Sequence, residues 1–210
     1  MEGECDEDHL ENTPLGLSYV SVASSQTGEV GYGTKLILRN GTFSKLIQGR
    51  IKDGDKLDGY GKMFYNQEKT IYYVGDWQNG KRHGHGTLHM ASYHYSGQWT
   101  NDKITGFGKI TWPKGNPGLY YEGQLKESKY HGHGKFIFRN GDVFDGEYSK
   151  GIRNGLGKEI KTNGDIFEGT WQGNKKIAGT LTRTKHDCVV KFKDGKPLND
   201  AYTSYCYSFT

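Results

Sequence analysis

The feature that most constrains the fold of this chain is a pair of glycines separated by one residue, which recurs along most of its length. Successive pairs begin 22 to 28 residues apart, at Gly31/Gly33, Gly59/Gly61, Gly84/Gly86, Gly106/Gly108, Gly132/Gly134 and Gly155/Gly157. A pattern repeated at a nearly fixed period indicates an array of structural repeats, each of which is one supersecondary unit. Any local motif must therefore be weighed against its place in the repeat.

A second pattern stands ahead of most of these pairs, with two large residues placed on either side of a glycine. It occurs at Tyr73–Gly75–Trp77, Tyr95–Gly97–Trp99, Tyr121–Gly123–Leu125, Phe144–Gly146–Tyr148 and Phe167–Gly169–Trp171. Large residues and glycines at i, i+2 and i+4 have the period of a β-strand with one buried face. The residues between them, such as Asp76, Glu122 and Glu147, are polar and belong on the other face.

Turn signals separate these segments. Asn79-Gly80 and Lys150-Gly151 lie within repeats, and Asn40-Gly41, Asn140-Gly141 and Asn163-Gly164 lie between them. Asn-Gly readily adopts the positive φ angles that a two-residue hairpin turn requires. The predicted fold is all-β: an elongated, single-layer antiparallel meander of stacked β-hairpins.

Glycine normally weakens a strand, and is found there where another group approaches the backbone closely. Here an aromatic ring can lie flat over the bare backbone and pack against other rings. We therefore predict a structural role for the repeat glycines Gly75, Gly84, Gly86, Gly97, Gly106, Gly108, Gly123, Gly132, Gly134, Gly146, Gly155, Gly157 and Gly169.

The segment from Tyr73 to Gly86 reads Tyr-x-Gly-x-Trp-x-x-Gly-Lys-x-x-Gly-x-Gly, which resembles the MORN repeat (membrane occupation and recognition nexus). The resemblance extends over residues 29–196 and is clearest between Tyr73 and Gly157. It weakens at both ends, where Ile47–Ile51 lacks the aromatics and Ala178–Leu181 lacks the glycine pair. The resemblance implies a twisted, groove-forming sheet of stacked hairpins.

We divide the chain into an acidic, flexible N-terminal tail (1–28), an array of about six hairpin units (29–197) and a short C-terminal tail (198–210). Seven of the 24 acidic residues lie in the first 29 residues, which contain no lysine or arginine. The remaining residues carry 17 acids against 28 bases, a formal charge of about +11. Such a division of charge often marks an interaction surface.

The aromatic residues of the repeats suggest a binding surface. A single layer of hairpins has only one face to bury, and large exposed aromatic surfaces mark interaction sites. We predict a partner-binding groove, filled by a helical or extended segment of another protein, whose lining is Tyr73, Trp77, Tyr95, Trp99, Tyr121, Phe144, Tyr148, Phe167 and Trp171. The alternative is that these rings form the core of the sheet.

Basic residues recur near the predicted hairpin turns, and stacking would align them as a stripe: Lys81, Arg82, Lys103, Lys129, Arg153 and Lys175. One interpretation is a surface that binds phosphoinositides or other anionic lipids at about 1 kcal/mol per basic residue. The other is a solvated edge that prevents strand pairing with other chains. Nucleic-acid binding is not expected, because the rings are predicted on a different face from the stripe.

Chemical motifs are weak in this sequence. In residues 75–87 the lysine precedes the glycines and no helix follows, so the stretch is not a phosphate-binding loop. The pairs His83/His85 and His131/His133 lie two repeats apart, roughly 20 Å, so one chain would not join them at one metal ion, although a dimer could. No catalytic residue, metal site or cofactor is predicted.

Cys5, Cys188 and Cys206 are odd in number and far apart, which suggests neither a disulfide framework nor a zinc ribbon. The acidic start does not resemble a signal peptide, and no run of 18 apolar residues occurs. We expect a soluble intracellular protein.

Proteins similar to this one commonly act as scaffolds in cilia, flagella and other cytoskeletal structures or at membrane junctions. The resemblance thus implies a non-catalytic scaffold or adaptor that binds other proteins in a ciliary, axonemal or other cytoskeletal assembly. The alternative is a membrane adaptor that binds phosphoinositides through the basic stripe. No small-molecule substrate is expected.

Overall fold

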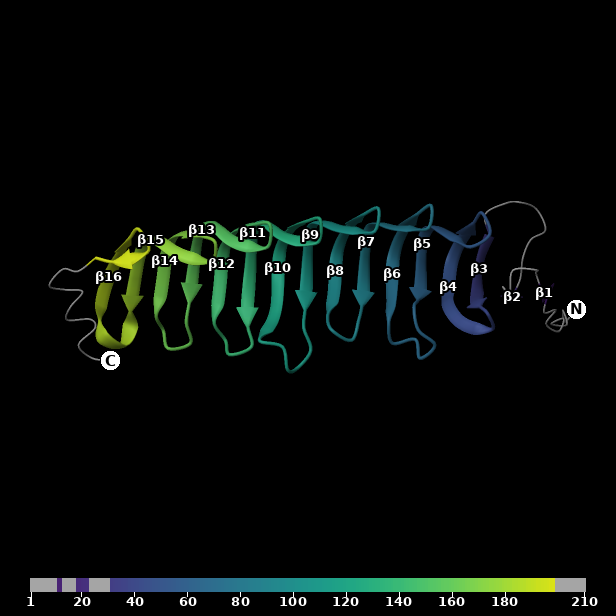
Figure 1. Ribbon diagram of the computed structural model, residues 1–210, viewed down its shortest axis with the longest axis horizontal. Coiled ribbons are helices and arrows are strands. Elements are labelled where there is room, and N and C mark those ends of the chain that lie inside the picture. Colours follow the sequence, from purple (N-terminus) through teal and green to yellow (C-terminus); the bar gives the residue numbers. More distant parts are fainter. Residues whose placement is uncertain (1–10, 13–17, 23–30, 199–210) are drawn as a thin grey trace, which may run out of the picture. The chain divides into compact units, whose positions relative to one another are not determined.

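This computed structural model describes residues 11–12, 18–22 and 31–198. In these residues the chain is all-β, apart from one 3-10 turn, η1 (Thr184–His186). The chain divides into two compact units, Met1–Lys103 and Ile104–Thr210. Within each unit the strands lie side by side in chain order (Figure 1). The predicted antiparallel meander of stacked hairpins is confirmed in both.

Among the described residues, unit 1 contains eight strands, and consecutive strands from β1 to β8 pair with one another. They are β1 (Glu11–Asn12), β2 (Ser18–Val22), β3 (Gly31–Arg39), β4 (Thr42–Lys52), β5 (Lys56–Phe64), β6 (Tyr72–Gln78), β7 (Lys81–His89) and β8 (His94–Thr100).

Unit 2 continues the same pattern from Ile104 onward. Its strands are β9 (Lys103–Thr111), β10 (Gly118–Lys126), β11 (Lys129–Phe138), β12 (Val143–Ser149), β13 (Ile152–Ile160), β14 (Ile166–Gln172), β15 (Lys175–Arg183), β16 (Cys188–Lys193) and β17 (Lys196–Pro197).

A line of glycines crosses the sheet of each unit, one glycine from each strand of β3–β8 in unit 1 and of β9–β15 in unit 2. In unit 1 the cross-strand partners are Gly33, Gly49, Gly61, Gly75, Gly86 and Gly97. In unit 2 they are Gly108, Gly123, Gly134, Gly146, Gly157, Gly169 and Gly179, after which Phe192 takes the next place. We call these two rows the glycine ladders. Because side chains alternate across a strand, the large repeat residues two positions away lie on the same face as the ladder, which we call the ring face.

In the Gly-x-Gly pairs, the second glycine lies in a glycine ladder, and the first lies outside it. Between the pairings Trp77↔Arg82 and Gly75↔Gly86, the three residues from His83 to His85 stand opposite Asp76 alone. This irregularity is a β-bulge, and Gly84 within it has φ 56°, a left-handed conformation that favours glycine. The Asp76 carboxylate accepts a 2.9 Å hydrogen bond from the His85 N–H and so satisfies the bulge. Gly106, Gly132 and Gly155 also have positive φ.

The turns that join the strands of a hairpin have a common form, in which two successive residues have positive φ. Asn79 and Gly80 adopt it, as predicted, with φ of 50° and 77°. Glu127 and Ser128 adopt it too, with φ of 50° and 61°, although neither residue type signals such a turn. A hydrogen bond of 2.8 Å from the Gly80 N–H to the Leu57 carbonyl ties the Asn79-Gly80 turn to β5, in the preceding hairpin. The register of the array therefore enforces the turn even where the local sequence does not.

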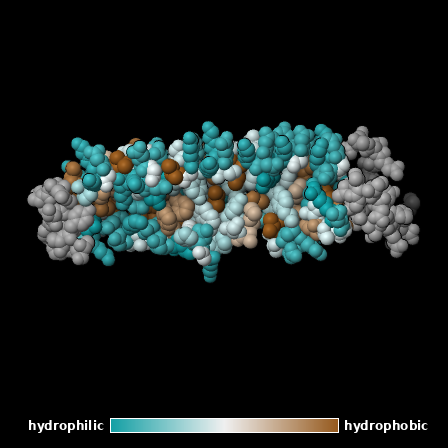
Figure 2. All heavy atoms as spheres, in the orientation of Figure 1, coloured by the Kyte–Doolittle hydropathy of each residue, from teal (hydrophilic) through white to brown (hydrophobic). Residues whose placement is uncertain are grey.

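On the face opposite the rings, unit 2 carries a row of alternating charge, one residue per strand: Lys109, Glu122, Lys135, Asp145, Lys158 and Glu168. Lys158 and Glu168 are 2.7 Å apart, and Lys109 and Glu122 are 3.2 Å apart. Opposite charges on neighbouring strands stabilise a sheet modestly. On β3 to β8 of unit 1, the equivalent places hold a single charged residue, Lys62. On the face visible in Figure 2, hydrophobic side chains stand singly among hydrophilic ones in each unit.

The segment predicted as the flexible N-terminal tail, residues 1–28, contains two of the described strands. They are β1 and β2, and β2 pairs with β3. The alternating residues of Ser18–Val22 carried this strand signal. The remainder of that segment, and the C-terminal tail beyond Leu198, lie outside the described residues.

Cys188 is disulfide-bonded, contrary to the expectation from the cysteine spacing. Cys5 and Cys206 lie outside the described residues. Disulfide formation depends on the distance between α-carbons in the fold, which sequence spacing does not give.

Candidate functional site

The nine rings predicted to line a partner groove are buried. Their exposed fractions are 5% or less for Tyr73, Trp77, Tyr95, Trp99, Tyr121, Phe144, Tyr148, Phe167 and Trp171. The prediction that these side chains form an exposed binding surface is therefore wrong, and they are the core of the sheet. Thirteen repeat glycines were predicted to be structural: nine lie in the glycine ladders, and Gly84, Gly106, Gly132 and Gly155 are the positive-φ first glycines of their pairs.

The rings cover one another along each unit. Tyr73 makes edge-to-face contacts with Trp77 and Trp99, at centroid distances of 4.9 and 5.3 Å. In unit 2, Phe144 and Phe167 both make such contacts with Trp171, at 5.1 and 5.4 Å. This geometry is favourable for aromatic pairs. A single-layer sheet can therefore bury its aromatic residues without a second layer.

The polar atoms of these rings are also satisfied. The indole N–H groups of Trp77, Trp99 and Trp171 donate to the carbonyls of Gly61, Gly86 and Gly157, at 3.0, 3.2 and 3.3 Å. Each acceptor belongs to a glycine ladder, so the same residue supplies both a flat surface and a hydrogen-bond acceptor. Little polar capacity on these rings remains for a partner.

A second aromatic group on the ring face of unit 2 is only half buried. We call it the aromatic patch: Trp112, Tyr130, Phe136 and Phe138. Phe136 lies 5.3 Å from Trp112 and 4.6 Å from Phe138, measured between centroids. Tyr130 stacks on the buried Tyr121 at 4.1 Å, and burial raises the pKa of its phenol to about 12, so it stays neutral. None of these four residues was among those predicted to line the partner-binding groove.

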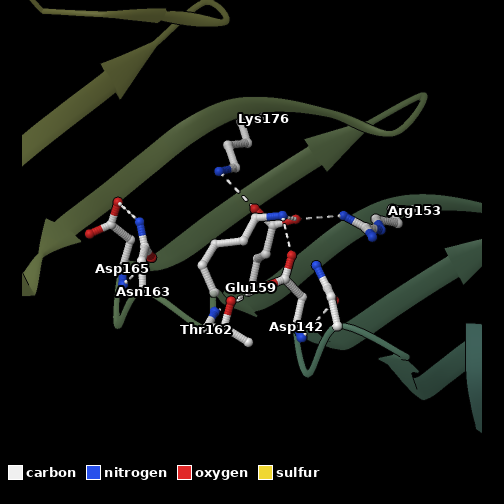
Figure 3. A network of polar contacts seen from close by, with 9 residues as sticks. Asp142, Arg153, Glu159, Thr162, Asn163, Asp165 and Lys176 are labelled. Atoms are coloured by element: carbon white, nitrogen blue, oxygen red, sulfur yellow. Dashed lines mark hydrogen bonds and ion pairs between the residues drawn. The ribbon is translucent and has the colours of Figure 1, made fainter. Parts of the chain in front are cut away.

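Unit 2 also contains a buried carboxylate, Glu159, which lies between Arg153 and Lys176 (Figure 3). Its row on the ring face otherwise holds apolar and aromatic residues: Ile110, Tyr121, Phe136, Phe144, Phe167, Leu181 and Val190. The carboxylate pairs with the Arg153 guanidinium at 3.0 Å and with the Lys176 ammonium at 2.9 Å. The Lys161 ammonium is 3.6 Å away.

A second buried carboxylate, Asp142, shares Lys161 with Glu159. The Lys161 ammonium donates to one Asp142 oxygen at 2.8 Å, and the Thr162 N–H donates to the other at 2.9 Å. Burial opposes the charge on Asp142, but these hydrogen bonds and one involving Asn140 outweigh it and lower the pKa of this carboxyl to about 2. Burial also opposes the charge on Glu159, and the hydrogen bond and charge of Lys176 are the main contacts that lower its pKa. Both acids are therefore ionised near neutral pH.

The predicted basic stripe separates into two groups. Lys81, Lys103, Lys129 and Lys175 are exposed, as expected of a stripe near the turns. Arg82 and Arg153 instead lie on the ring face, where their guanidinium carbons sit 4.3 Å from the ring centroids of Trp99 and Phe144. Arg82 also pairs with Asp102 at 2.9 Å. The prediction that rings and basic residues occupy separate faces is wrong for these arginines, because each stands opposite a large repeat residue, Trp77 or Tyr148.

The histidine pairs lie in bulges, not in a metal site. His83 and His85 flank Gly84, and His131 and His133 occupy the equivalent segment opposite Gln124. His133 contacts Asp145 at 3.1 Å on the face opposite the rings. Among the described residues, no group of three or more histidines, cysteines or acids is placed to hold a metal ion. Over the same part of the chain, no helix has the length and apolar character needed to cross a membrane.

Comparison with known proteins identifies the repeat. The MORN-repeat family model matches four successive segments, residues 73–94, 95–116, 121–143 and 144–166. This region is shorter than the 29–196 over which we saw the resemblance, and it leaves out the degenerate ends. No curated protein matches the chain.

Proposed function

We propose that this chain, which carries four MORN repeats between residues 73 and 166, is a scaffold that binds a segment of another protein on the ring face of unit 2. Repeats of this type generally mediate protein or membrane interactions and are typically non-catalytic. The nine buried repeat rings hold the sheet together. The partner contacts the aromatic patch.

One observation supports this placement: Trp112, Tyr130, Phe136 and Phe138 form a contiguous, half-exposed aromatic cluster above a fully buried core. Aromatic side chains supply much of the binding energy at protein interfaces. A helical or extended segment is the occupant that we propose, since either form can present apolar side chains along the face of a sheet. That the assembly is ciliary or cytoskeletal is part of the proposal and is supported only by the family resemblance.

Affinity capture from a ciliated-cell extract tests the proposal, at about 0.15 M and then about 0.5 M salt. Wild type is compared with the double variant Trp112→Ser/Phe138→Ser and with Phe107→Ser, a control in which an exposed ring is removed from the opposite face. Urea midpoints establish that all three chains are folded. A protein retained at high salt by wild type and Phe107→Ser, but lost by the double variant, supports the proposal.

A separate experiment tests the alternative function, binding to an anionic membrane. The exposed lysines Lys81, Lys103, Lys129 and Lys175 remain available to anionic lipid headgroups. Sedimentation with vesicles that contain phosphoinositide, repeated at both salt concentrations, measures this binding. Salt-sensitive vesicle binding that is unchanged by the double variant, with no protein partner captured, would replace the scaffold by a membrane adaptor.

A further inference from the structure

Glu159 occupies a place where the repeat otherwise has an apolar side chain. Its cross-strand neighbours on the ring face are Phe144 and Phe167, both fully buried. In the preceding hairpin Phe136 holds the equivalent position, beside Tyr121. Buried ion pairs are seldom more stabilising than apolar residues of similar volume, because the desolvation of the charges offsets their attraction. Stability alone therefore does not explain this glutamate.

The arrangement of the charges suggests another role. The two carboxylates lie deepest, with side chains 8% exposed for Glu159 and 10% exposed for Asp142. The cations above them are more accessible: 16% for Arg153, 27% for Lys176 and 43% for Lys161. Three positive and two negative charges leave a net charge of +1. The buried acids thus hold three cationic side chains in fixed positions on the ring face.

This group, Arg153, Lys161 and Lys176, which we call the cation cluster, adjoins the aromatic patch. The Arg153 guanidinium carbon is 5.6 Å from the centroid of the Phe138 ring, so one side chain contacts both. The Phe138 N–H donates to the Asp142 carbonyl at 2.9 Å, which ties the end of β11 to the residue that binds Lys161. An apolar surface and a positively charged surface are therefore continuous.

We propose that the cation cluster binds an acidic side chain of the partner segment, one whose neighbouring apolar side chain packs on the aromatic patch. A carboxylate is complementary to the net charge of the cluster, and hydrogen bonds between ionised groups are about twice as strong as neutral ones. Because the cations are already positioned by Glu159 and Asp142, binding orders few additional side chains. This inference rests on the proposed function and specifies the chemistry of the segment bound at the same site.

The test uses a random peptide library displayed on phage and selected against the full chain. We expect the selected peptides to carry Asp or Glu at a fixed spacing from an aromatic or large aliphatic residue. The most enriched peptide is then synthesised, and its Kd is measured for the wild type and for single variants of this chain.

The variants shift the charge of the site in opposite directions. Lys161→Gln and Lys176→Gln each remove one positive charge and should weaken binding about tenfold, the value of one charged hydrogen bond. Glu159→Gln raises the net charge of the site and should tighten binding, whereas simple structural damage would weaken it. Lys158→Gln is the matched control, since it removes a lysine from β13, the strand that carries Glu159, but from the opposite face. The Kd for this variant should stay within a factor of two of wild type.

Each other outcome overturns a different statement. Peptides without an acidic preference, whose binding is lost in Trp112→Ser/Phe138→Ser, would leave the proposed function intact and exclude the acidic ligand. Equal weakening by Lys161→Gln and Lys158→Gln would show a general charge effect and also exclude it. If no selected peptide depends on the aromatic patch, the proposed function and the inference both fail.

Discussion

The Tyr73 ring lies directly on the backbone of Gly86 in the neighbouring strand. A β-carbon built on Gly86 would overlap the phenol, with Tyr73 Cε2 at 2.6 Å and the hydroxyl oxygen nearer still. The same relationship joins Tyr121 to Gly134 and Phe144 to Gly157. Tyr73 also donates from its hydroxyl to the Asp76 carbonyl at 3.2 Å, which fixes the ring over the glycine.

Gly86→Ala should therefore destabilise the protein by about 1–3 kcal/mol, because an extra methyl group in a packed core forces its neighbours to shift. The measurement is urea unfolding followed by tryptophan fluorescence. Gly31→Ala is the matched control, since a β-carbon at Gly31 meets nothing within 4 Å, and it should change the free energy of unfolding by about 0.5 kcal/mol or less. If Gly86→Ala were equally neutral, the contact between Tyr73 and Gly86 would not be a determinant of packing.

Arg82→Ala should lower the free energy of unfolding by about 1–2 kcal/mol, whereas Lys81→Ala should leave it within about 0.5 kcal/mol of wild type. Arg82 stacks on Trp99 and pairs with Asp102, and its neighbour Lys81 is exposed. Arg82→Lys keeps the charge but loses the flat guanidinium and should fall between them. Equal effects at the two positions would mean that the packing of Arg82 on the rings contributes nothing.

Glu159→Leu should destabilise the protein by about 3–5 kcal/mol, because it leaves Arg153 and Lys176 without their buried counter-charge. The triple variant Glu159→Leu/Arg153→Met/Lys176→Met removes the charges together and should unfold with a free energy close to, or above, that of wild type. Thermal and urea unfolding of both variants distinguish the two cases. A triple variant as unstable as the single one would show that the ion pairs are needed for folding itself.

Stability should fall as the pH is lowered from about 5 to about 2, partly through Asp142. The pKa of its carboxyl is about 2 in the folded protein, below the ordinary value of 3.8, so the charged form stabilises the folded state. The stabilisation that Asp142 contributes is fully present above about pH 3.8 and is lost as the pH falls through about 2. Urea midpoints across this range should show a shallower pH dependence in Asp142→Asn. Glu159, whose pKa is also lowered, accounts for part of the remaining slope.

The class of the fold and the buried face of each repeat strand were predictable because the signal repeats. Tyr73–Gly75–Trp77 and its equivalents set the face of each strand, and Asn79-Gly80 located a turn. Each repeat carries the same information, so an ambiguity in one hairpin is resolved by the next. The turn at Glu127–Ser128 was missed because neither residue type is characteristic of such a turn. The strand Ser18–Val22 was missed although its residues alternate, because it lies outside the repeat pattern.

The exposure of the rings was not predictable from the pattern. Alternation gives the face on which Trp99 lies, but its burial depends on edge-to-face contacts with Tyr73 from another hairpin. The candidate site was missed for a related reason. Glu159 reads as one more charged residue in Lys158-Glu159, and only the cross-strand register shows that it stands between Phe144 and Phe167.

The row of alternating charge in unit 2 restricts how the length of such an array can vary. The odd-numbered strands β9, β11 and β13 supply its lysines, and the even-numbered strands β10, β12 and β14 supply its acids. Deleting one strand would place two like charges side by side and reverse the direction of every strand after it. Deleting two consecutive strands would restore the alternation, the chain direction and the overlap of ring on glycine. The array therefore obeys a parity rule: its length is adjustable in whole hairpins and in no smaller step.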